Sequence, residues 1–154
     1  MDALISRLRA DYPRFSFTAG ELASWSPHLQ QITYRNDEGD EAIWSLFHEL
    51  GHALLDHNTY NSDLELLQKE AAAWEKAKSI GVGYKLEIHP DHIQDCLDTY
   101  RDWLHRRSTC PACNAHGLQT SQRLYQCPNC RNTWKVSSAR FCRPYRLKMA
   151  QKAM

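Results

Sequence analysis

The sequence predicts an α+β protein, in which a small, mostly antiparallel sheet packs on two helices and a cysteine-rich module follows. Three observations predict this class. Alternating apolar segments occur before residue 36, helical patterns continue to about residue 105, and two Cys-x-x-Cys pairs come after residue 108. We therefore divide the chain into a first domain, residues 1–107, and a basic module with its tail, residues 108–154.

The N-terminal third predicts one helix and three strands. Residues 2–11 form a short amphipathic pattern that ends before Pro13, since proline cannot continue a helix. The alternation of apolar and polar residues then predicts strands over 14–18, 22–26 and 30–35. As a hypothesis, the segment 31–34 could bind an extended peptide by strand addition.

A His-Glu-x-x-His motif, at His48, Glu49 and His52, lies in a helix predicted over residues 41–57. Helical spacing places the two histidines one turn apart on one face, so both imidazoles can reach one metal ion. Glu49 lies beside them, where a carboxylate can take a proton from water. Catalytic zinc normally has three protein ligands and an open fourth position, so a third ligand is expected.

The next predicted helix, 64–80, supplies that ligand. A Ser-x-x-Glu capping box at Ser62 and Glu65 opens it, and Gly81 closes it. Glu70 falls near the centre of its apolar face, where an ionised carboxylate is costly to bury unless a cation meets it. Zinc would supply that charge, and a buried Arg or Lys is the alternative partner.

His57 is a competing third ligand. If the motif helix continues, it points about 180° away from His48, so the two cannot share a metal unless the chain breaks after Leu55. We therefore expect His57 to face solvent at the end of the helix. A further helix is predicted over 89–105, and Cys96 falls on its apolar stripe, where it is expected to pack in the core.

Four cysteines predict a second metal site. They form two Cys-x-x-Cys knuckles separated by 13 residues, and are Cys110, Cys113, Cys127 and Cys130. Four thiolates at this spacing make a closed tetrahedral zinc site, with a short hairpin over 118–125 between the knuckles. A segment this small draws folding energy from its metal, so this zinc is expected to be structural. Disulfides are the alternative, whereas Cys142 has no predicted role.

Charge is divided unevenly along the chain. Residues 106–154 contain ten Lys and Arg and no Asp or Glu, which gives a charge of +10, whereas residues 1–105 carry −9. A basic module with aromatic residues suits phosphate contact and base stacking, in DNA or RNA. A solubilising tail and a surface that docks on the acidic half are the alternatives. The residues predicted to bind nucleic acid are Arg123, Arg131, Trp134, Lys135, Arg140 and Arg143.

The chain lacks the sequence features of a membrane protein. No apolar run approaches the roughly 20 residues that cross a bilayer, and the first residues lack the apolar region of a secretory signal. We expect a cytoplasmic location and no membrane partner.

The motif residues resemble the active-site core of the ImmA/IrrE group of zinc metallopeptidases. The likeness lies in His-Glu-Leu-Gly-His at 48–52 and Glu-Ala-Ala-Ala-Trp at 70–74, and it extends over about residues 30–80. It implies that His48, His52 and Glu70 bind zinc, that Glu49 is the base, and that substrates include DNA-bound repressors. Ala72 stands where that group has Asn or Asp, and a zinc ribbon stands where some members have a helix-turn-helix.

Two alternatives remain open. SprT-like proteases, which act on DNA–protein crosslinks, also join His-Glu-x-x-His to a zinc-binding tail, but their third ligand is a downstream histidine. A non-catalytic binding module would use the ribbon alone. We expect a zinc endopeptidase with one catalytic and one structural zinc ion. The candidates for its oxyanion donor are Tyr34, Tyr60, Tyr84 and His89.

Overall fold

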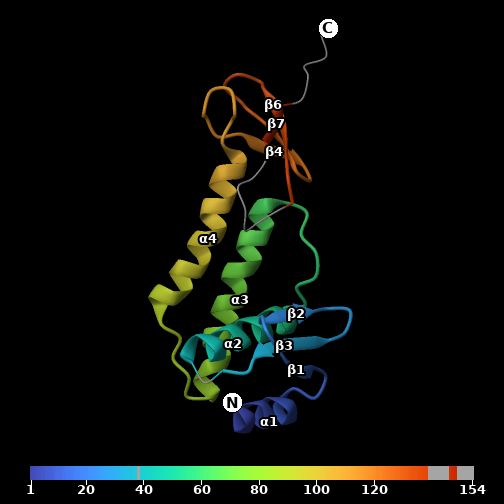
Figure 1. Ribbon diagram of the computed structural model, residues 1–154, viewed down its shortest axis with the longest axis vertical. Coiled ribbons are helices and arrows are strands. Elements are labelled where there is room, and N and C mark those ends of the chain that lie inside the picture. The colour runs from blue at the N-terminus through green and yellow to red at the C-terminus, as the bar shows by residue number, and fades with distance from the viewer. Residues whose placement is uncertain (38, 139–145, 149–154) are drawn as a thin grey trace. The chain divides into compact units, whose positions relative to one another are not determined.

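The computed structural model describes residues 1–37, 39–138 and 146–148 (Figure 1). This part of the chain is an α+β protein with four helices, and the longest strands have five residues. The helices are α1 (Asp2–Asp11), α2 (Asp40–Leu54), α3 (Asp63–Gly83) and α4 (Pro90–Ser108). The strands are β1 (Ser16–Gly20), β2 (Ser24–Ser26), β3 (Gln31–Arg35), β4 (Leu118–Ser121), β5 (Leu124–Gln126), β6 (Thr133–Val136) and β7 (Arg146–Lys148). None of the described helices is long and apolar enough to cross a membrane.

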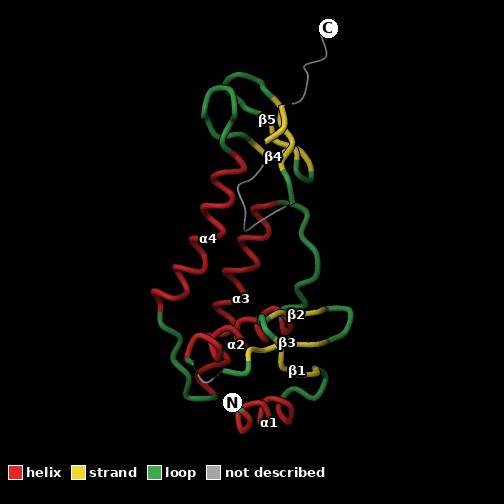
Figure 2. Tube along the Cα trace, in the orientation of Figure 1, coloured by secondary structure: helices red, strands yellow, loops and turns green. Residues whose placement is uncertain are grey.

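The chain forms two compact units. The first comprises Met1–Thr59 and Gln68–Ile93, and the second comprises Tyr60–Leu67 and Gln94–Met154. Each unit contains one of the two small sheets, drawn in yellow in Figure 2. Helices α3 and α4 contribute residues to both units, so the cysteine module belongs to a unit that also includes the first turn of α3.

The sheet of the first unit has the strand order β1-β3-β2. Strand β2 runs antiparallel to β3, with Trp25 opposite Ile32, whereas β1 runs parallel to β3, with Phe17 opposite Ile32. The prediction of a mostly antiparallel sheet is therefore wrong for this unit. The hairpin of β2 and β3 occupies one edge of β3, so β1 pairs with the other edge. Because β3 is the central strand, strand addition at 31–34 is also excluded.

Helix α2 packs against β2 and β3 on one side and against α3 on another (Figure 1). Its contact with α3 depends on Gly51, because a Cβ at this position would lie 2.4 Å from the carbonyl oxygen of Ala73. This close approach brings the His-Glu-x-x-His helix beside the helix that carries Glu70. The buried side chains of these elements include Leu46, Phe47 and Leu50 in α2, Trp74 and Ala77 in α3, and Ile32 in β3.

The sheet of the second unit is antiparallel throughout, with the order β4-β5-β6-β7. The predicted hairpin between the two knuckles is present as β4 and β5. Tyr125 and Trp134 lie opposite each other in β5 and β6, and their rings stack with centroids 5.7 Å apart. Both side chains are buried, and together with Val136 they lie in the core of the ribbon, which comprises β4–β7 and the two knuckles.

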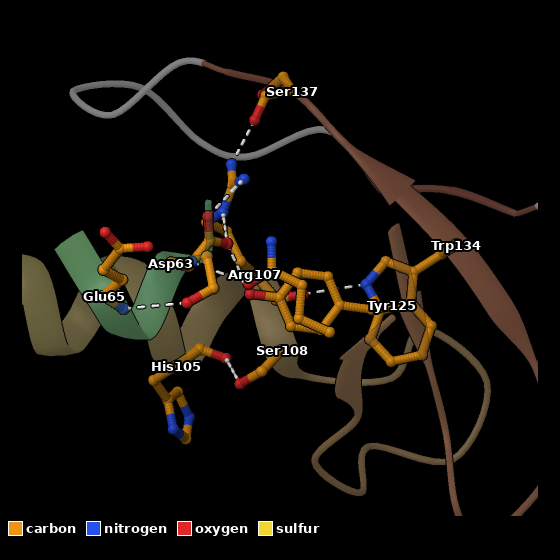
Figure 3. Close-up of polar contacts among 10 residues, drawn as sticks. Asp63, Glu65, His105, Arg107, Ser108, Tyr125, Trp134 and Ser137 are labelled. Carbon is orange, nitrogen blue, oxygen red and sulfur yellow. Dashed lines mark hydrogen bonds and ion pairs between the residues drawn. The ribbon is translucent and has the colours of Figure 1, made fainter. Parts of the chain in front are cut away.

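A buried ion pair joins the helices of this unit to its sheet (Figure 3). The Arg107 guanidinium donates to both carboxylate oxygens of Asp63, over 2.6 Å from Nε and 3.3 Å from Nη2. Tyr125 donates its hydroxyl proton to the same carboxylate, over 2.5 Å, and Arg107 Nη1 also donates to the carbonyl of Ser137. Arg107 and Asp63 are only 2% and 3% exposed, so the buried charge of each is compensated by the charge of the other.

Candidate metal centres

Two helices of the first unit bring three donor atoms together. His48 and His52 extend from α2, and Glu70 extends from α3. The two histidine Nε2 atoms are 3.1 Å apart, and Glu70 Oε2 is 3.1 Å from His48 Nε2 and 3.5 Å from His52 Nε2. The structure thus brings the predicted third ligand to both histidines.

These separations match the ligand spacing of a zinc ion. With zinc–ligand bonds of about 2.0–2.1 Å, the edges of a tetrahedron are about 3.3 Å long. The three donors are two imidazole nitrogens and a carboxylate oxygen, which is a ligand set that catalytic zinc takes. His48, His52 and Glu70 therefore form a group that could bind a metal ion.

The surroundings of Glu70 favour its ionised form. Its carboxylate is almost entirely buried, at 6% exposed. Although burial raises its pKa, hydrogen bonds with His48 and His52 outweigh that effect and hold the pKa well below its usual range. Its recorded partners are these histidines rather than the Lys or Arg of the alternative explanation. Trp74, one helical turn later, stacks on the His48 ring at 4.2 Å and fixes its plane.

Glu49 lies beside this group and has an unusually high affinity for a proton. Burial raises its pKa, and Glu70 raises it further, whereas His48 and His52 lower it. The backbone N–H of Trp25, in the edge strand β2, also donates to the Glu49 carboxylate. Glu49 therefore lies close enough to the three donor residues for their charges to affect its pKa, although it is not a member of the donor group.

The region around His57 differs from the prediction. Helix α2 ends at Leu54, and Asp56 adopts a left-handed conformation with φ of 50°, so the chain turns back before His57. His57 is half-buried, and its Nδ1 lies 2.8 Å from Nδ1 of His52. Burial, and then the neighbouring His52, lower its pKa to about 4. The prediction that His57 faces solvent is therefore wrong.

The four cysteines form a second group that could bind a metal ion. Sγ of Cys110 is 3.6 Å from that of Cys130, and Sγ of Cys113 is 3.6 Å from that of Cys127. A disulfide requires about 2.05 Å, whereas zinc–sulfur bonds of about 2.3 Å place the ligands about 3.8 Å apart. The spacing therefore supports the metal-site prediction over disulfides.

The two knuckles share one backbone geometry. The residue after each second cysteine, Asn114 or Arg131, has a left-handed conformation, with φ of 59° and 60°. Its N–H donates to the carbonyl of the first cysteine in the knuckle, over 3.0 Å in both cases. The two Cys-x-x-Cys pairs thus share one turn, and their four Sγ atoms lie within 4.8 Å of one another.

The thiols of Cys113 and Cys130 differ in proton affinity. Hydrogen bonding from the Ala115 backbone N–H lowers the pKa of Cys113 to about 6. Asn132 has the same effect on Cys130, but burial and the neighbouring thiols prevail and raise its pKa to about 12. Four adjacent thiolates thus need a cation to coexist, and binding of that cation would displace protons.

The residues predicted to bind nucleic acid have different environments. Arg123, Arg131 and Lys135 are exposed. Trp134 is 0% exposed, and its indole N–H donates to the carbonyl of Arg107 over 2.9 Å, so the prediction that it stacks on bases is wrong. Arg140, Arg143 and Cys142 lie outside the described residues, and Cys96 is half-buried in α4.

Tyr84, one of the four candidates for the oxyanion donor, has another partner. Its hydroxyl donates to Asp11 over 2.6 Å, and burial, followed by that hydrogen bond, raises its pKa. This proton is directed to α1 rather than to the donor set.

Sequence reasoning missed three features: the contact between His57 and His52, the hydrogen bond from Trp25 to Glu49, and the Asp63–Arg107 ion pair. The first depends on a left-handed residue at Asp56, where glycine is usual, so no residue type at this position predicts the turn. The other two depend on tertiary contacts between distant segments. A buried ion pair has no periodicity that would identify it in advance.

No family model matches the sequence, and no curated protein or solved structure is detectably similar to it. The resemblance to the ImmA/IrrE group therefore depends on the motif residues alone. The geometry and chemistry of the two donor sets carry the functional argument.

Proposed function

We propose that this chain is a zinc-dependent endopeptidase whose catalytic centre is formed by His48, His52 and Glu70. The observation that carries the proposal is the convergence of their three donor atoms at 3.1–3.5 Å, with Glu49 beside them. Hydrolytic zinc centres use such a set because three protein ligands leave a coordination position for a reactant. Zinc bound there would polarise the scissile carbonyl and lower the pKa of water.

Glu49 is the general base and then the general acid. It accepts a proton from the attacking water and returns it to the leaving nitrogen of the peptide bond. Its raised pKa suits the second step, because the carboxyl group must hold the proton until the amine leaves.

The proximity of Glu70 to His48 and His52 favours Glu70 as the third ligand over the SprT-like alternative, in which a downstream histidine is the third ligand. A metal count tests it directly. The purified chain should bind about two zinc ions, and Glu70→Ala should bind about one. Cys113→Ser is the matched control, because it should reduce the count through the other site. Two zinc ions in Glu70→Ala would place the third ligand elsewhere.

Catalysis is tested with Glu49→Gln. Unfolded casein and a mixed peptide library are incubated with the zinc-loaded chain, and new termini are identified by mass spectrometry. Wild type should generate them, and Glu49→Gln should not, although it still binds two zinc ions. Glu41→Gln, an exposed change in the first turn of the same helix, should leave cleavage unchanged. Equal cleavage by wild type and Glu49→Gln would refute the assigned role.

We further propose that the ribbon brings the peptidase to nucleic acid or to proteins bound there, such as repressors. Arg123 and Arg131 are exposed and have left-handed conformations, with φ of 65° and 60°, which glycine and asparagine adopt more easily. Two arginines at such positions support a function for their side chains. Lys135 adds a third exposed positive charge, and residues 106–154 contain no acidic residue.

Fluorescence anisotropy with labelled single-stranded DNA, duplex DNA and RNA over a range of salt concentrations tests this targeting. Asparagine tolerates left-handed geometry, so Arg123→Asn and Arg131→Asn remove charge with little strain. Each should weaken binding and reduce the salt slope by about one. Lys78→Gln, an exposed change in the first unit, should have no effect. Binding that is absent or insensitive to salt would indicate a protein-docking ribbon.

A further inference from the structure

We propose that His57 is a positioning residue that fixes the tautomer and ring orientation of His52. The proposal rests on the zinc centre of the proposed function, and it assigns a role to a histidine outside the ligand set. It follows from the turn that ends α2, the contacts that hold this turn, and the proton inventory of the two imidazoles.

The backbone turn places His57 over His52. Two hydrogen bonds close it: His57 N–H donates to the His52 carbonyl over 3.0 Å, and Asp56 N–H donates to the Ala53 carbonyl over 3.3 Å. With Asp56 in the left-handed conformation, this is a Schellman motif. The motif brings its last residue back to the third residue from the helix end, which here is His52.

A second contact fixes this turn to the sheet. Trp25 Nε1 donates to the His57 carbonyl over 3.0 Å, and Trp25 belongs to β2. The position of His57 is thus determined from two sides, by the turn that ends α2 and by Trp25 of β2.

The number of protons on the two imidazoles then determines which ring donates the hydrogen bond between them. His52 Nε2 faces His48 and Glu70, so a metal ion bound there takes the lone pair of Nε2. In a neutral imidazole the proton is then on Nδ1, which lies 2.8 Å from Nδ1 of His57. His57 must accept this proton, which leaves its own proton on Nε2. The opposite arrangement would place a proton on His52 Nε2 and block the metal.

His48 is held in a different way, so the two ligands do not depend on the same support. The buried Nδ1 of His48 has no hydrogen-bond partner in the described part of the chain, and stacking on Trp74 fixes its ring instead. A hydrogen-bond partner of the ring nitrogen that does not bind the metal typically contributes about 10- to 100-fold to metal affinity. Loss of His57 therefore leaves His52 without its orienting hydrogen bond, and Trp74 cannot replace it.

The test compares His57→Leu with His57→Asn in the full zinc-loaded chain. Leucine cannot accept a hydrogen bond, whereas Asn Oδ1 can occupy the place of the histidine Nδ1. Competition with a zinc chelator should show that His57→Leu weakens the first site by about 10- to 100-fold, and that His57→Asn recovers most of this loss. The zinc ion of the four cysteines serves as an internal control, since its affinity should not change.

A spectroscopic measurement separates positioning from general stability. In ¹⁵N-histidine-labelled protein with zinc bound, a scalar coupling between Nδ1 of His52 and Nδ1 of His57 should show that they share a proton, bonded to His52. A proton bonded to His57 Nδ1, or equal zinc affinity in wild type and His57→Leu, would overturn the proposal. If wild type binds only the zinc ion of the four cysteines, the zinc centre of His48, His52 and Glu70 does not exist, and the proposed function and the role of His57 both fail. Two zinc ions without peptide hydrolysis would refute the proposed enzyme but not the role of His57.

Discussion

Replacing Arg107 with methionine should destabilise the second unit strongly. The substitution leaves the Asp63 carboxylate buried, with Tyr125 as its remaining side-chain donor in the described network. Methionine retains most of the apolar stem but lacks the guanidinium, whose Cζ lies 4.3 Å from the Trp103 ring centre. The main change is therefore the loss of the guanidinium and its hydrogen bonds.

The expected loss is about 3–5 kcal/mol, because removal of one partner leaves the other charge buried and uncompensated. Domains of this kind have total stabilities of about 5–15 kcal/mol, so the variant would lose a large fraction. Arg106→Met is the matched control: Arg106 is exposed, and its replacement should change stability by less than about 0.5 kcal/mol. Asp63→Asn in the Arg107→Met background should recover part of the loss, because the buried charge is then removed.

Urea denaturation of the zinc-loaded chain measures this loss. The indole N–H signal of Trp134 reports on the second unit alone, since its proton is donated to the Arg107 carbonyl in the ribbon core. The midpoint for Arg107→Met should fall well below those of wild type and Arg106→Met. A loss under about 1 kcal/mol, or equal losses in the two variants, would refute the argument that this ion pair is essential to the buried network.

Three further substitutions test the packing and the turns. Gly51→Ala should destabilise the first unit by roughly 1–3 kcal/mol, because its methyl group would lie 2.4 Å from the Ala73 carbonyl oxygen. Gly83→Ala, which meets nothing within 4 Å, is its control in thermal unfolding. Asp56→Gly should stabilise the same unit by about 1 kcal/mol by relieving the left-handed conformation, and an unchanged midpoint would contradict this. Tyr125→Phe should cost about 1.5–3 kcal/mol at neutral pH. Burial, and then the hydrogen bond to a carboxylate, raise the pKa of Tyr125 above 10, so wild-type stability should fall as pH rises above about 10, and this fall should be smaller in the phenylalanine variant.

Local signals in the sequence predicted much of the first unit. In the first unit the helix at residues 2–11 has the predicted bounds, and at the start of α3, in the second unit, the Glu65 N–H donates to Ser62 Oγ over 3.1 Å, which is one of the two hydrogen bonds of the predicted capping box. Glu70 was identified because an ionisable residue interrupted an apolar face. Each of these features is determined within one or two helical turns, where spacing alone fixes which side chains lie together.

Features that depend on partners distant in sequence were predicted less well. Alternation identified β1 and β3, but it contains no information on which strands pair or in which direction, so the parallel pair was missed. Trp134 was assigned to the surface because basic residues surround it. In β6, however, Trp134 and Val136 face inward and Lys135 outward, so the alternation itself was the better guide than the local charge.

Some departures from local preference lie at the two donor sets, although Gln30, Lys85 and Arg123 have left-handed conformations elsewhere. Asp56 has a left-handed conformation in the turn that presents His57 to His52, and Asn114 and Arg131 have it directly after the second cysteine of each knuckle. Glu70 occupies a buried position on α3, where an apolar residue would suit the helix face. A chain selected for stability alone would favour glycine in the turns and an apolar residue at 70. If the two donor sets bind metal as proposed, the left-handed turns and the buried charge of Glu70 would serve to position the ligands and their supports.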